Sequence, residues 1–563
     1  MDNILVIEDK STNLANALGV RNKLTYSGQS TDEEITEWLK KGAEEMGNIS
    51  RNISKIILPC RIGIDDNSFM GIYIGLHIRL TKQLPENIRF AQIVFLSVET
   101  REEILEDLLK QKNKNGLFLF TKGVVLTEDI KVVHSIPAEF IDQDVFYNEI
   151  LSNIVIEQQK DKGHQLANEW GAFRLAKFAG CSLSIPEPAN LFFKYKDTLT
   201  LNELGIKGDS LTGRVKKSCK ALLVDDQAYK GWFDVLNFIL RKKVIWEDET
   251  LKLDVFSSFD EAMSFSGFQD YDIIFLDLRL LPEEDKTNKV IDIEEYSGSK
   301  ILKKIKKENK GTQVIIFTAS NKIWNIDKLK EKEDLGADGY YIKESPEFVL
   351  SEKFSKENFL ELKTSIEKCL YKKPLRDIYR KIEGNKERLS QLKKNNIIDK
   401  DLLKPLNLQM DLAYSLIQRA VNKDDYAIAY ITLFKCIECI NDCYVVSISD
   451  YKSTYWTITK IANTNNKLKQ YDYESVETKP AKFKEAGPST FEKIAGFAIQ
   501  YLALKEEHIR QIGWNIFRRN KFIHPPDEDS LTERQKLEKD KIYSFAGFEE
   551  LLESISNIIM NLK

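Results

Sequence analysis

Five side chains in the middle of the chain have the types and the order needed for chemistry on a phosphoryl group. They are Asp225, Asp226, Asp277, Thr318 and Lys343. Three carboxylates that meet in one crevice repel one another unless a hard divalent cation lies among them, and Mg²⁺ takes oxygen ligands of this kind. An ammonium and a hydroxyl would complete a pocket for a phosphoryl group. We therefore expect a Mg²⁺ site formed by the three aspartates.

The elements that must position these side chains are short apolar runs separated by amphipathic segments, the pattern of a parallel sheet covered by helices. In an open α/β sheet, polar residues at the carboxyl ends of the strands meet in one crevice. The sequence therefore predicts a doubly wound parallel sheet within residues 217–372. The expected strands are ALLVDD (221–226), LKLDVF (251–256), DIIFLDLRL (272–280), TQVIIFTAS (312–320) and GADGYYIKES (336–345).

This set of residues resembles the receiver domain of two-component response regulators, because residue type, order and strand-end position all agree with that family. The resemblance implies that Asp277 is the phosphoacceptor and that a partner sensor histidine kinase phosphorylates it. Asp226, with Asp225 beside it, would bind Mg²⁺, and Lys343 would pair with the phosphate.

The same resemblance makes Thr318 the switch hydroxyl and Tyr341 the switch aromatic. Two features depart from the family. The interval from Asp277 to Thr318 is 41 residues and contains an acidic insertion, PEEDKTNKVIDIEEY, and the proline that usually follows the lysine is replaced by Glu344. The alternatives are that these residues are only the polar ends of buried strands, or that the domain is an unphosphorylated relic.

Residues 1–145 look like a degenerate copy of the same unit, which opens with the strand NILVIED (3–9). The runs GLHIRL (75–80), IVFLSV (93–98) and LFLFTKG (117–123) can be set beneath the third, fourth and fifth strands of the second unit. This alignment predicts another receiver-like sheet. The equivalents of its site residues are then Glu8, Asp9, His77, Ser97 and Lys122.

The chemistry of this first unit is expected to differ. An imidazole does not form the acyl phosphate that a carboxylate forms, and the interval from His77 to Ser97 is short for a strand, helix and strand. We therefore predict a pseudo-receiver that accepts no phosphate on an aspartate and serves as a docking or dimerising module. The alternative is that His77 itself is phosphorylated or binds a ligand.

A helical connector is expected over residues 146–216. Its segment HQLANEWGAFRLAKFAG (164–180) has apolar residues at roughly helical spacing, which favours core packing.

After residue 372 the strand pattern stops, and segments with a 3.6-residue period continue to the end. We expect a helical linker over residues 373–394 and an all-α bundle over residues 395–563. Within the bundle, Arg519, Asn520 and His524 place a cation, an amide and an imidazole within about one helical turn. Metal-free cleavage of a phosphodiester needs a base of near-neutral pKa and a guanidinium that stabilises the phosphorane.

The R-N-x3-H arrangement late in a helical bundle resembles the HEPN domain, found in many metal-independent ribonucleases of toxin and defence systems. The resemblance implies a homodimer with a composite cleft and no cofactor at this site. His524 would be the general acid or base, Arg519 the transition-state stabiliser and Asn520 the orienting group, with Arg518 and Lys521 contacting phosphates of an RNA substrate. The alternative is a surface helix end that stops at His-Pro-Pro.

Three cysteines, Cys436, Cys439 and Cys443, share one helix face. No fourth ligand lies nearby in the sequence, so core packing is the expected role rather than zinc binding.

The composition excludes several classes of protein. The 563 residues carry 83 Lys and Arg against 87 Asp and Glu, which gives a net charge of −4. Residues 373–563 contain 31 basic and 27 acidic residues, so this part is mildly basic and the rest is acidic. We expect no membrane span and no export signal, and hence a cytoplasmic protein. No helix-turn-helix with basic recognition residues stands out, so specific DNA binding is not expected.

These expectations combine into a response regulator whose phosphorylation on Asp277 controls a HEPN-like ribonuclease, with stress or anti-phage defence as the output. The chief alternative is a noncatalytic, phosphorylation-dependent scaffold or dimerisation protein with an inactive bundle. A weaker alternative is one half of a toxin–antitoxin pair that is controlled by a separate nucleotidyltransferase.

Overall fold

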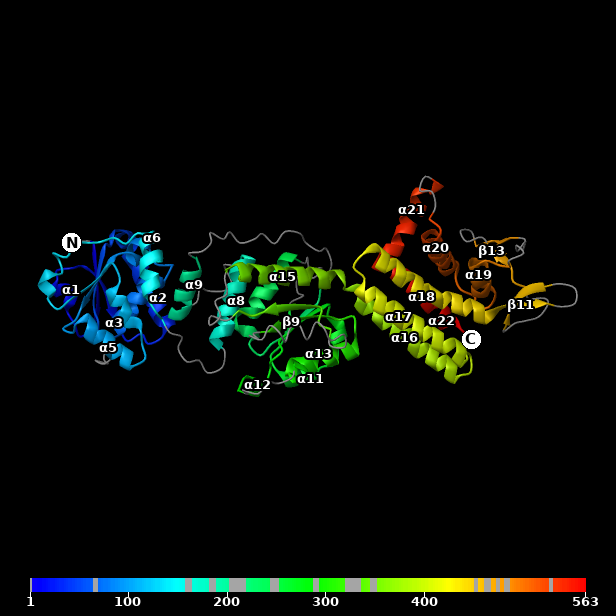
Figure 1. Ribbon diagram of the computed structural model, residues 1–563, viewed down its shortest axis with the longest axis horizontal. Coiled ribbons are helices and arrows are strands. Elements are labelled where there is room, and N and C mark those ends of the chain that lie inside the picture. The colour runs from blue at the N-terminus through cyan, green and yellow to red at the C-terminus, as the bar shows by residue number, and fades with distance from the viewer. Residues whose placement is uncertain are drawn as a thin grey trace.

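The chain forms two α/β units followed by a helical region, arranged in a row along the long axis of the molecule (Figure 1). The computed structural model describes residues 3–63, 69–156, 165–181, 189–201, 219–243, 253–286, 293–318, 336–344, 352–449, 454–459, 467–471, 476–479, 487–525 and 530–563. Among the helices of these segments, none is both long and apolar enough to cross a membrane.

The first unit contains a five-stranded parallel sheet in the order β2-β1-β3-β4-β5. This 2-1-3-4-5 order is flavodoxin-like and places a topological switch point between the first and third strands. The strands are β1 (Ile4–Asp9), β2 (Asn22–Tyr26), β3 (Lys55–Pro59), β4 (Gln92–Leu96) and β5 (Val124–Thr127). The main helices are α1 (Leu14–Ala17), α2 (Asp32–Met46), α3 (Met70–Leu80), α4 (Glu86–Arg89) and α5 (Arg101–Lys110).

The second unit repeats this topology with the order β7-β6-β8-β9-β10, again all parallel. Its strands are β6 (Ala221–Val224), β7 (Asp254–Phe256), β8 (Ile273–Leu276), β9 (Gln313–Thr318) and β10 (Gly339–Ile342). One face is covered by α10 (Phe233–Lys243) and α15 (Glu352–Tyr371), and the other by α11 (Phe259–Ser264) and α13 (Ser297–Glu308). Each face has its own buried apolar cluster, as expected for a sheet with helices on both sides.

The described part of the predicted connector is divided between the two units. Helix α8 (Gln165–Ala179) packs on α10 and α15 of the second unit, whereas α9 (Leu191–Leu201) packs on α3 of the first. Figure 1 shows α9 beside the first unit and α8 beside the second. The two helices α8 and α9 are therefore integral parts of the second and the first unit, respectively.

The helical region contains seven main helices in its described segments, and all of them except α21 contribute to one large apolar core. Helix α16, which covers the expected linker, packs against α17 and α22 and so belongs to the bundle. The helices are α16 (Pro374–Lys394), α17 (Lys400–Arg419), α18 (Lys423–Tyr444), α19 (Thr490–Gln500), α20 (Glu506–Ile523), α21 (Glu533–Asp540) and α22 (Phe545–Asn561).

The expectation that strands end after residue 372 is wrong. An antiparallel hairpin of β11 (Val445–Ser449) and β12 (Thr454–Ile458) follows α18, and a shorter pair, β13 (Gln470–Tyr471) with β14 (Thr478–Lys479), follows it. The run VVSIS continues directly from the helical pattern, so no turn signal separates the two. The overall fold class, two flavodoxin-like sheets followed by a mainly helical region, is nevertheless confirmed.

The three cysteines of α18 lie in or beside the apolar core. Cys436 is buried and its thiol donates to the Leu406 carbonyl at 3.9 Å, while Cys439 and Cys443 are half-buried against the same core. Burial raises the pKa of Cys439, which keeps this thiol protonated.

Candidate functional site

The carboxyl ends of β6, β8, β9 and β10 bring the predicted phosphoryl-site residues together. Asp225 follows β6, Asp277 follows β8, Thr318 ends β9 and Lys343 follows β10. The Lys343 Nζ lies 2.5 Å from Asp277 Oδ2 and 2.8 Å from Asp225 Oδ2. All four side chains are buried, and the ammonium bridges two carboxylates at the centre of the crevice.

Backbone hydrogen bonds orient the two buried carboxylates. The amide of Gln227 donates to Asp225 Oδ1 at 2.8 Å, and the amide of Arg279 donates to Asp277 Oδ1 at 3.2 Å. Each aspartate thus has one oxygen held by the chain and the other directed at Lys343.

Burial and charge act in opposite directions on these groups. Burial raises the pKa of Asp225 to about 6, with Lys343 opposing the rise and the neighbouring Asp277 adding to it. Burial alone lowers the pKa of Lys343, but its ion pairs with Asp225 and Asp277 raise that pKa above its usual value. A carboxylate that is costly to ionise becomes stable as an anion when a further cation arrives.

The residues fit a divalent cation. Carboxylate oxygens of Asp225, Asp226 and Asp277 all lie within 4.8 Å of one another, and within the described segments this is the single group of three or more candidate metal ligands. Asp225 Oδ2 is buried and receives no hydrogen bond of good geometry, although it is ion-paired with Lys343. Asp226 is exposed and is held by the side-chain amide of Gln227 at 2.9 Å. Hard oxygen ligands open to solvent on one side suit Mg²⁺.

The two tyrosines of β10 face opposite sides of the sheet. Tyr341 is 2% exposed and stacks on Phe317, with ring centroids 4.7 Å apart, in the cluster beneath α8, α10 and α15. Tyr340 is only partly buried, on the side of α11 and α13. The switch role of Tyr341 stays a prediction, and its side chain is packed more tightly than that of Tyr340. Strand alternation could have separated the two.

Part of the acidic insertion after β8 folds back onto α13. Helix α12 (Pro282–Lys286) supplies Glu284, which accepts from the Ser297 amide at 2.6 Å and from its hydroxyl at 2.7 Å. This carboxylate lies at the N-terminus of α13, where negative charge is stabilising. Residues 287–292 of the insertion lie outside the described segments.

In the first unit, the predicted position of His77 is wrong. His77 belongs to α3 and not to a strand end. GIYIGLHIRL is buried along most of its length, so it lacks the polar face that marks an amphipathic helix, and its apolar run resembled a strand. His77 Nε2 lies 3.0 Å from Asp32 Oδ1, and its Nδ1 lies 3.3 Å from the Lys194 Nζ of α9. It therefore forms part of the contact between α3 and α9.

Pro59 occupies the position that corresponds to Asp277. In both units a helix begins beside the third strand with a glycine as its second residue. A Cβ on Gly71 would lie 1.9 Å from the Pro59 carbonyl oxygen, and one on Gly298 would lie 2.1 Å from that of Asp277. The strand pairing agrees, because Pro59 pairs with Leu96, the residue before Ser97. Proline has no nucleophile, so this unit has no phosphoacceptor at that position.

The other predicted equivalents have different outcomes. Glu8 and Asp9 end β1 as expected, and Ser97 follows β4 as Thr318 ends β9. The prediction that Lys122 follows the fifth strand is wrong. LFLF belongs to a 3-10 helix (Asn115–Phe120), and the fifth strand begins only at Val124.

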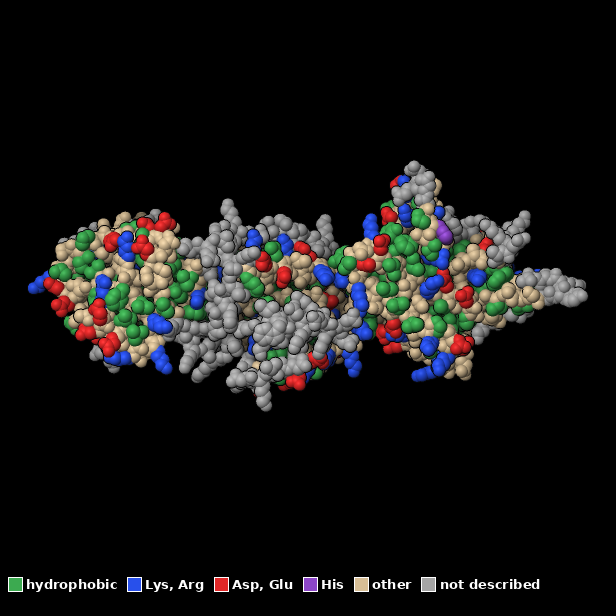
Figure 2. Space-filling model, in the orientation of Figure 1, with side chains coloured by type: hydrophobic (Ala, Val, Ile, Leu, Met, Phe, Trp, Pro, Cys, Tyr) green, Lys and Arg blue, Asp and Glu red, His purple; other side chains and the backbone are tan. Residues whose placement is uncertain are grey.

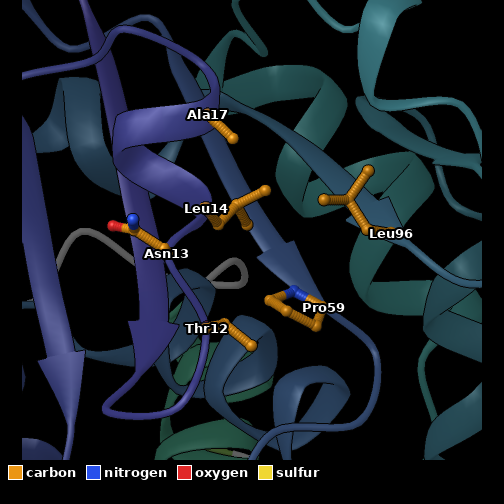
Figure 3. Close-up of a pocket in the computed structure, with 6 residues that line it drawn as sticks. All are labelled: Thr12, Asn13, Leu14, Ala17, Pro59 and Leu96. Atoms are coloured by element: carbon orange, nitrogen blue, oxygen red, sulfur yellow. The ribbon is translucent and has the colours of Figure 1, made fainter.

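The acidic pair of the first unit, Glu8 and Asp9, forms contacts with nearby residues. Glu8 pairs with Lys23 at 3.0 Å and accepts from the Ala15 amide, and Asp9 accepts from the amides of Ser11 and Thr12. The space above the strand ends is an open, mainly apolar hollow of about 430 Å³, seen in Figure 3. It is lined by Thr12, Asn13, Leu14, Ala17, Pro59 and Leu96.

The R-N-x3-H residues lie at the C-terminal end of α20. Arg519 is partly exposed, donates to Glu438 Oε1 of α18 at 2.8 Å and donates to Asn520 Oδ1 at 3.1 Å. His524 caps the helix and is exposed. The guanidinium proposed to stabilise a transition state is therefore paired with a carboxylate in this structure.

Arg518 is not a phosphate ligand, contrary to expectation. It is 1% exposed and pairs with Glu538 and, at 2.5 Å, with Glu550. Its Nη1 also donates to Asn515 Oδ1 at 2.9 Å. This buried network ties α20 to α21 and α22, so Arg518 has a structural role, while the neighbouring Lys521 stays partly exposed.

A comparison with protein-family models finds the inactive receiver domain at residues 2–127. This match agrees with the loss of the phosphoacceptor at Pro59 and with the pseudo-receiver prediction for the first unit. No curated protein matches the chain.

Proposed function

We propose that the chain is a phosphorylation-responsive receiver protein in which Asp277 accepts a phosphoryl group from a partner histidine kinase. The observation that supports this most directly is the contact of the Lys343 ammonium with Asp277, beside two further carboxylates that fit Mg²⁺. The first unit lacks an equivalent nucleophile and acts as the docking module.

The chemistry follows from these contacts. An Asp277 oxygen attacks the phosphorus of a phosphohistidine, the new P–O bond replaces the P–N bond, and the electron pair of that bond stays on the imidazole nitrogen of the donor. Mg²⁺ held by the three aspartates would offset the negative charge that gathers there. Lys343 then leaves Asp225 and pairs with a phosphoryl oxygen, and Thr318 offers a hydroxyl to another.

Labelling with acetyl phosphate and Mg²⁺ tests this proposal. We expect one hydroxylamine-labile phosphoryl group per chain in the wild-type protein and none in Asp277→Asn. Asp9→Asn is the matched control, because it alters an acidic residue at the equivalent end of β1 in the first unit, and it should label normally. Labelling that survives in Asp277→Asn, or no labelling of the wild type, would refute the proposal.

We propose a second function for the helical region, as the output of the phosphorylation: a metal-independent ribonuclease. It is supported by the hydrogen-bonded pair Arg519 and Asn520 and the exposed His524 on one helix end. The ion pair of Arg519 with Glu438 supports the rival scaffold function, since a neutralised guanidinium stabilises a phosphorane poorly. On the face in Figure 2, basic and acidic side chains of this region are interspersed.

The variant Glu438→Gln separates the two outputs. If the region is a ribonuclease, releasing Arg519 should raise cleavage of total RNA, and His524→Ala should abolish it. Arg510→Gln, which removes an exposed ion pair on the same helix, should change nothing. Absence of cleavage with and without beryllofluoride, in the wild type and in Glu438→Gln, would assign the scaffold function instead.

A further inference from the structure

Helix α8 packs directly against the residue that follows Lys343. A Cβ on Gly171 would lie 2.8 Å from the carbonyl oxygen of Glu344 and 2.8 Å from the Trp232 ring. The Trp232 indole donates to Asn168 of α8 at 3.0 Å, and the Lys343 ammonium lies 5.3 Å from the centroid of that ring. The backbone at Glu344 therefore has no space to move toward α8 unless the helix moves too.

A chain of buried charges continues from this contact. Arg174 of α8 is 1% exposed, and its Nε lies 3.7 Å from Glu344 Oε2. Ser355 of α15 accepts from Arg174 at 3.1 Å and donates to Glu344 at 2.7 Å. Burial raises the pKa of Glu344, and Arg174 opposes that rise. The residue that replaces the usual proline is thus fixed by the connector helix.

Arg174 also reaches toward the first unit. Its Nη1 lies 3.8 Å from Asp197 Oδ1 on α9. Asp197 is buried and pairs with Lys82, the second residue after α3 of the first unit, and with Lys177 at 2.8 Å. Although burial by itself raises the pKa of Asp197, Lys82 and Lys177 hold it below its usual value. Three successive contacts, Glu344 with Arg174, Arg174 with Asp197, and Asp197 with Lys82, therefore link the residue after Lys343 to the first unit.

Phosphorylation would disturb the first of these groups. Lys343 now bridges Asp225 and Asp277, and a phosphoryl group adds about two negative charges beside it. Lys343 must change partners, and Glu344 is the next residue along the chain. Separating a buried ion pair leaves each charge without its partner, which is costly. A shift of Glu344 should therefore move Arg174 with it and not break the pair.

We propose that the Glu344–Arg174 pair couples the phosphorylation state of Asp277 to the docking of α8 and α9, and thereby to the pseudo-receiver. Arg174 is a positioning residue that holds Glu344, and through it Lys343, in the unphosphorylated arrangement. This inference rests on the proposed phosphorylation of Asp277 and adds the route by which the first unit senses it.

Beryllofluoride with Mg²⁺, which mimics the acyl phosphate, tests the coupling in the full chain. Arg174→Met and Glu344→Gln remove the pair from either side. Because the pair favours the unphosphorylated arrangement, we expect both variants to bind beryllofluoride at least about fivefold more tightly than the wild type, the lower end of typical coupling. Glu169→Gln, also on α8, is the control. It removes an ion pair to Lys230 and leaves Glu344 and Arg174 unchanged.

Amide hydrogen exchange supplies the second measurement. In the wild type, beryllofluoride should speed exchange in residues 165–179 and 191–201, and in both variants the response of residues 191–201 should be lost while the control retains it. Unchanged or weaker affinity in the variants, or a wild-type exchange response that persists in them, would overturn the coupling alone. No binding to the wild type would overturn the proposed function together with this inference.

Discussion

At the scale of single residues, the partners around a side chain decide its role. Arg518 and Arg519 are neighbours on α20, yet one is buried between two carboxylates and the other is partly exposed with a single one. Asp225 and Asp226 are likewise adjacent, and only Asp225 is buried. Such pairs allow a substitution and its control to be made one position apart.

We expect Arg518→Met to destabilise the helical region by about 1.5–3 kcal/mol, because it removes the buried cation that Glu538 and Glu550 share, although Lys541 still pairs with both carboxylates. Arg519→Met should cost about 1 kcal/mol or less, since its pair with Glu438 is partly solvated. Chemical denaturation followed by circular dichroism measures both. Equal losses for the two variants would contradict the structural assignment of Arg518.

The raised pKa of Asp225 predicts a pH-dependent stability of the second unit. Its folded-state pKa of about 6 exceeds the ordinary 3.8, so the native state binds the proton more tightly than the unfolded state. The stabilisation is complete below the ordinary pKa and is lost as the pH rises through about 6, by about 3 kcal/mol in total.

Without Mg²⁺, the wild type should therefore lose stability between about pH 4 and about pH 7 relative to Asp225→Asn, and excess Mg²⁺ should restore it at the higher pH. Denaturant midpoints at the two pH values, with and without the metal, measure the effect. A wild-type profile that parallels that of Asp225→Asn would show that Asp225 titrates normally.

At the scale of elements, the same backbone contact positions the helix that follows the third strand in both units. α3 and α13 each donate the amide of a glycine, Gly71 or Gly298, to a backbone carbonyl just after that strand. The contact fixes the distance between the helix and the position of Asp277 in one unit and Pro59 in the other.

We expect Gly298→Ala to destabilise the second unit by about 1–3 kcal/mol or more, and to weaken binding of beryllofluoride, because the added methyl group would displace the backbone of Asp277. Gly71→Ala should destabilise the first unit similarly and leave beryllofluoride binding unchanged. Gly384→Ala in the exposed middle of α16 meets no atom within 4 Å and should stabilise by about 1 kcal/mol. Thermal unfolding and calorimetric titration measure these effects, and normal binding by Gly298→Ala would contradict the positioning role.

At the scale of the whole molecule, two sheets of the same topology differ in the chemistry of their strand ends, and the connector contacts both. The cations of Lys82, Arg174 and Lys177 meet at Asp197, which draws α8, α9 and the first unit to one carboxylate. Lys194 of α9 adds hydrogen bonds to Thr36 and Thr81 of the first unit.

Asp197→Asn should therefore loosen α9 from the first unit, since it leaves three cations around a neutral amide at a cost of about 3–5 kcal/mol. Faster amide exchange in residues 191–201 measures the loss. Lys196→Gln on the same helix is the control and should exchange like the wild type, because Lys196 is only partly buried and its ammonium lies over the Phe192 and Tyr195 rings of α9 itself. Equal protection of α9 in both variants would contradict this role of Asp197 and would show that apolar contacts alone hold α9 on the first unit.

The order of polar residues at strand ends was enough to predict the second sheet, its crevice and the four residues that the structure brings together there, because successive parallel strands must end at one edge. The repeat of the unit and Ser97 at the end of β4 were also predictable from the pattern. The helix of His77 was not, since a helix buried on nearly all sides has no polar period.

Only the tertiary structure decided which side chains contact one another. Pro59 at the phosphoacceptor position, Arg518 inside a carboxylate network, Arg519 beside Glu438, and Arg174 beside Glu344 all depend on residues far apart in the chain. Sequence by itself determined where strands and helices carry charge, because local periodicity reflects burial. Which charges meet depends on how those elements pack, and packing fixes distances that no local pattern contains.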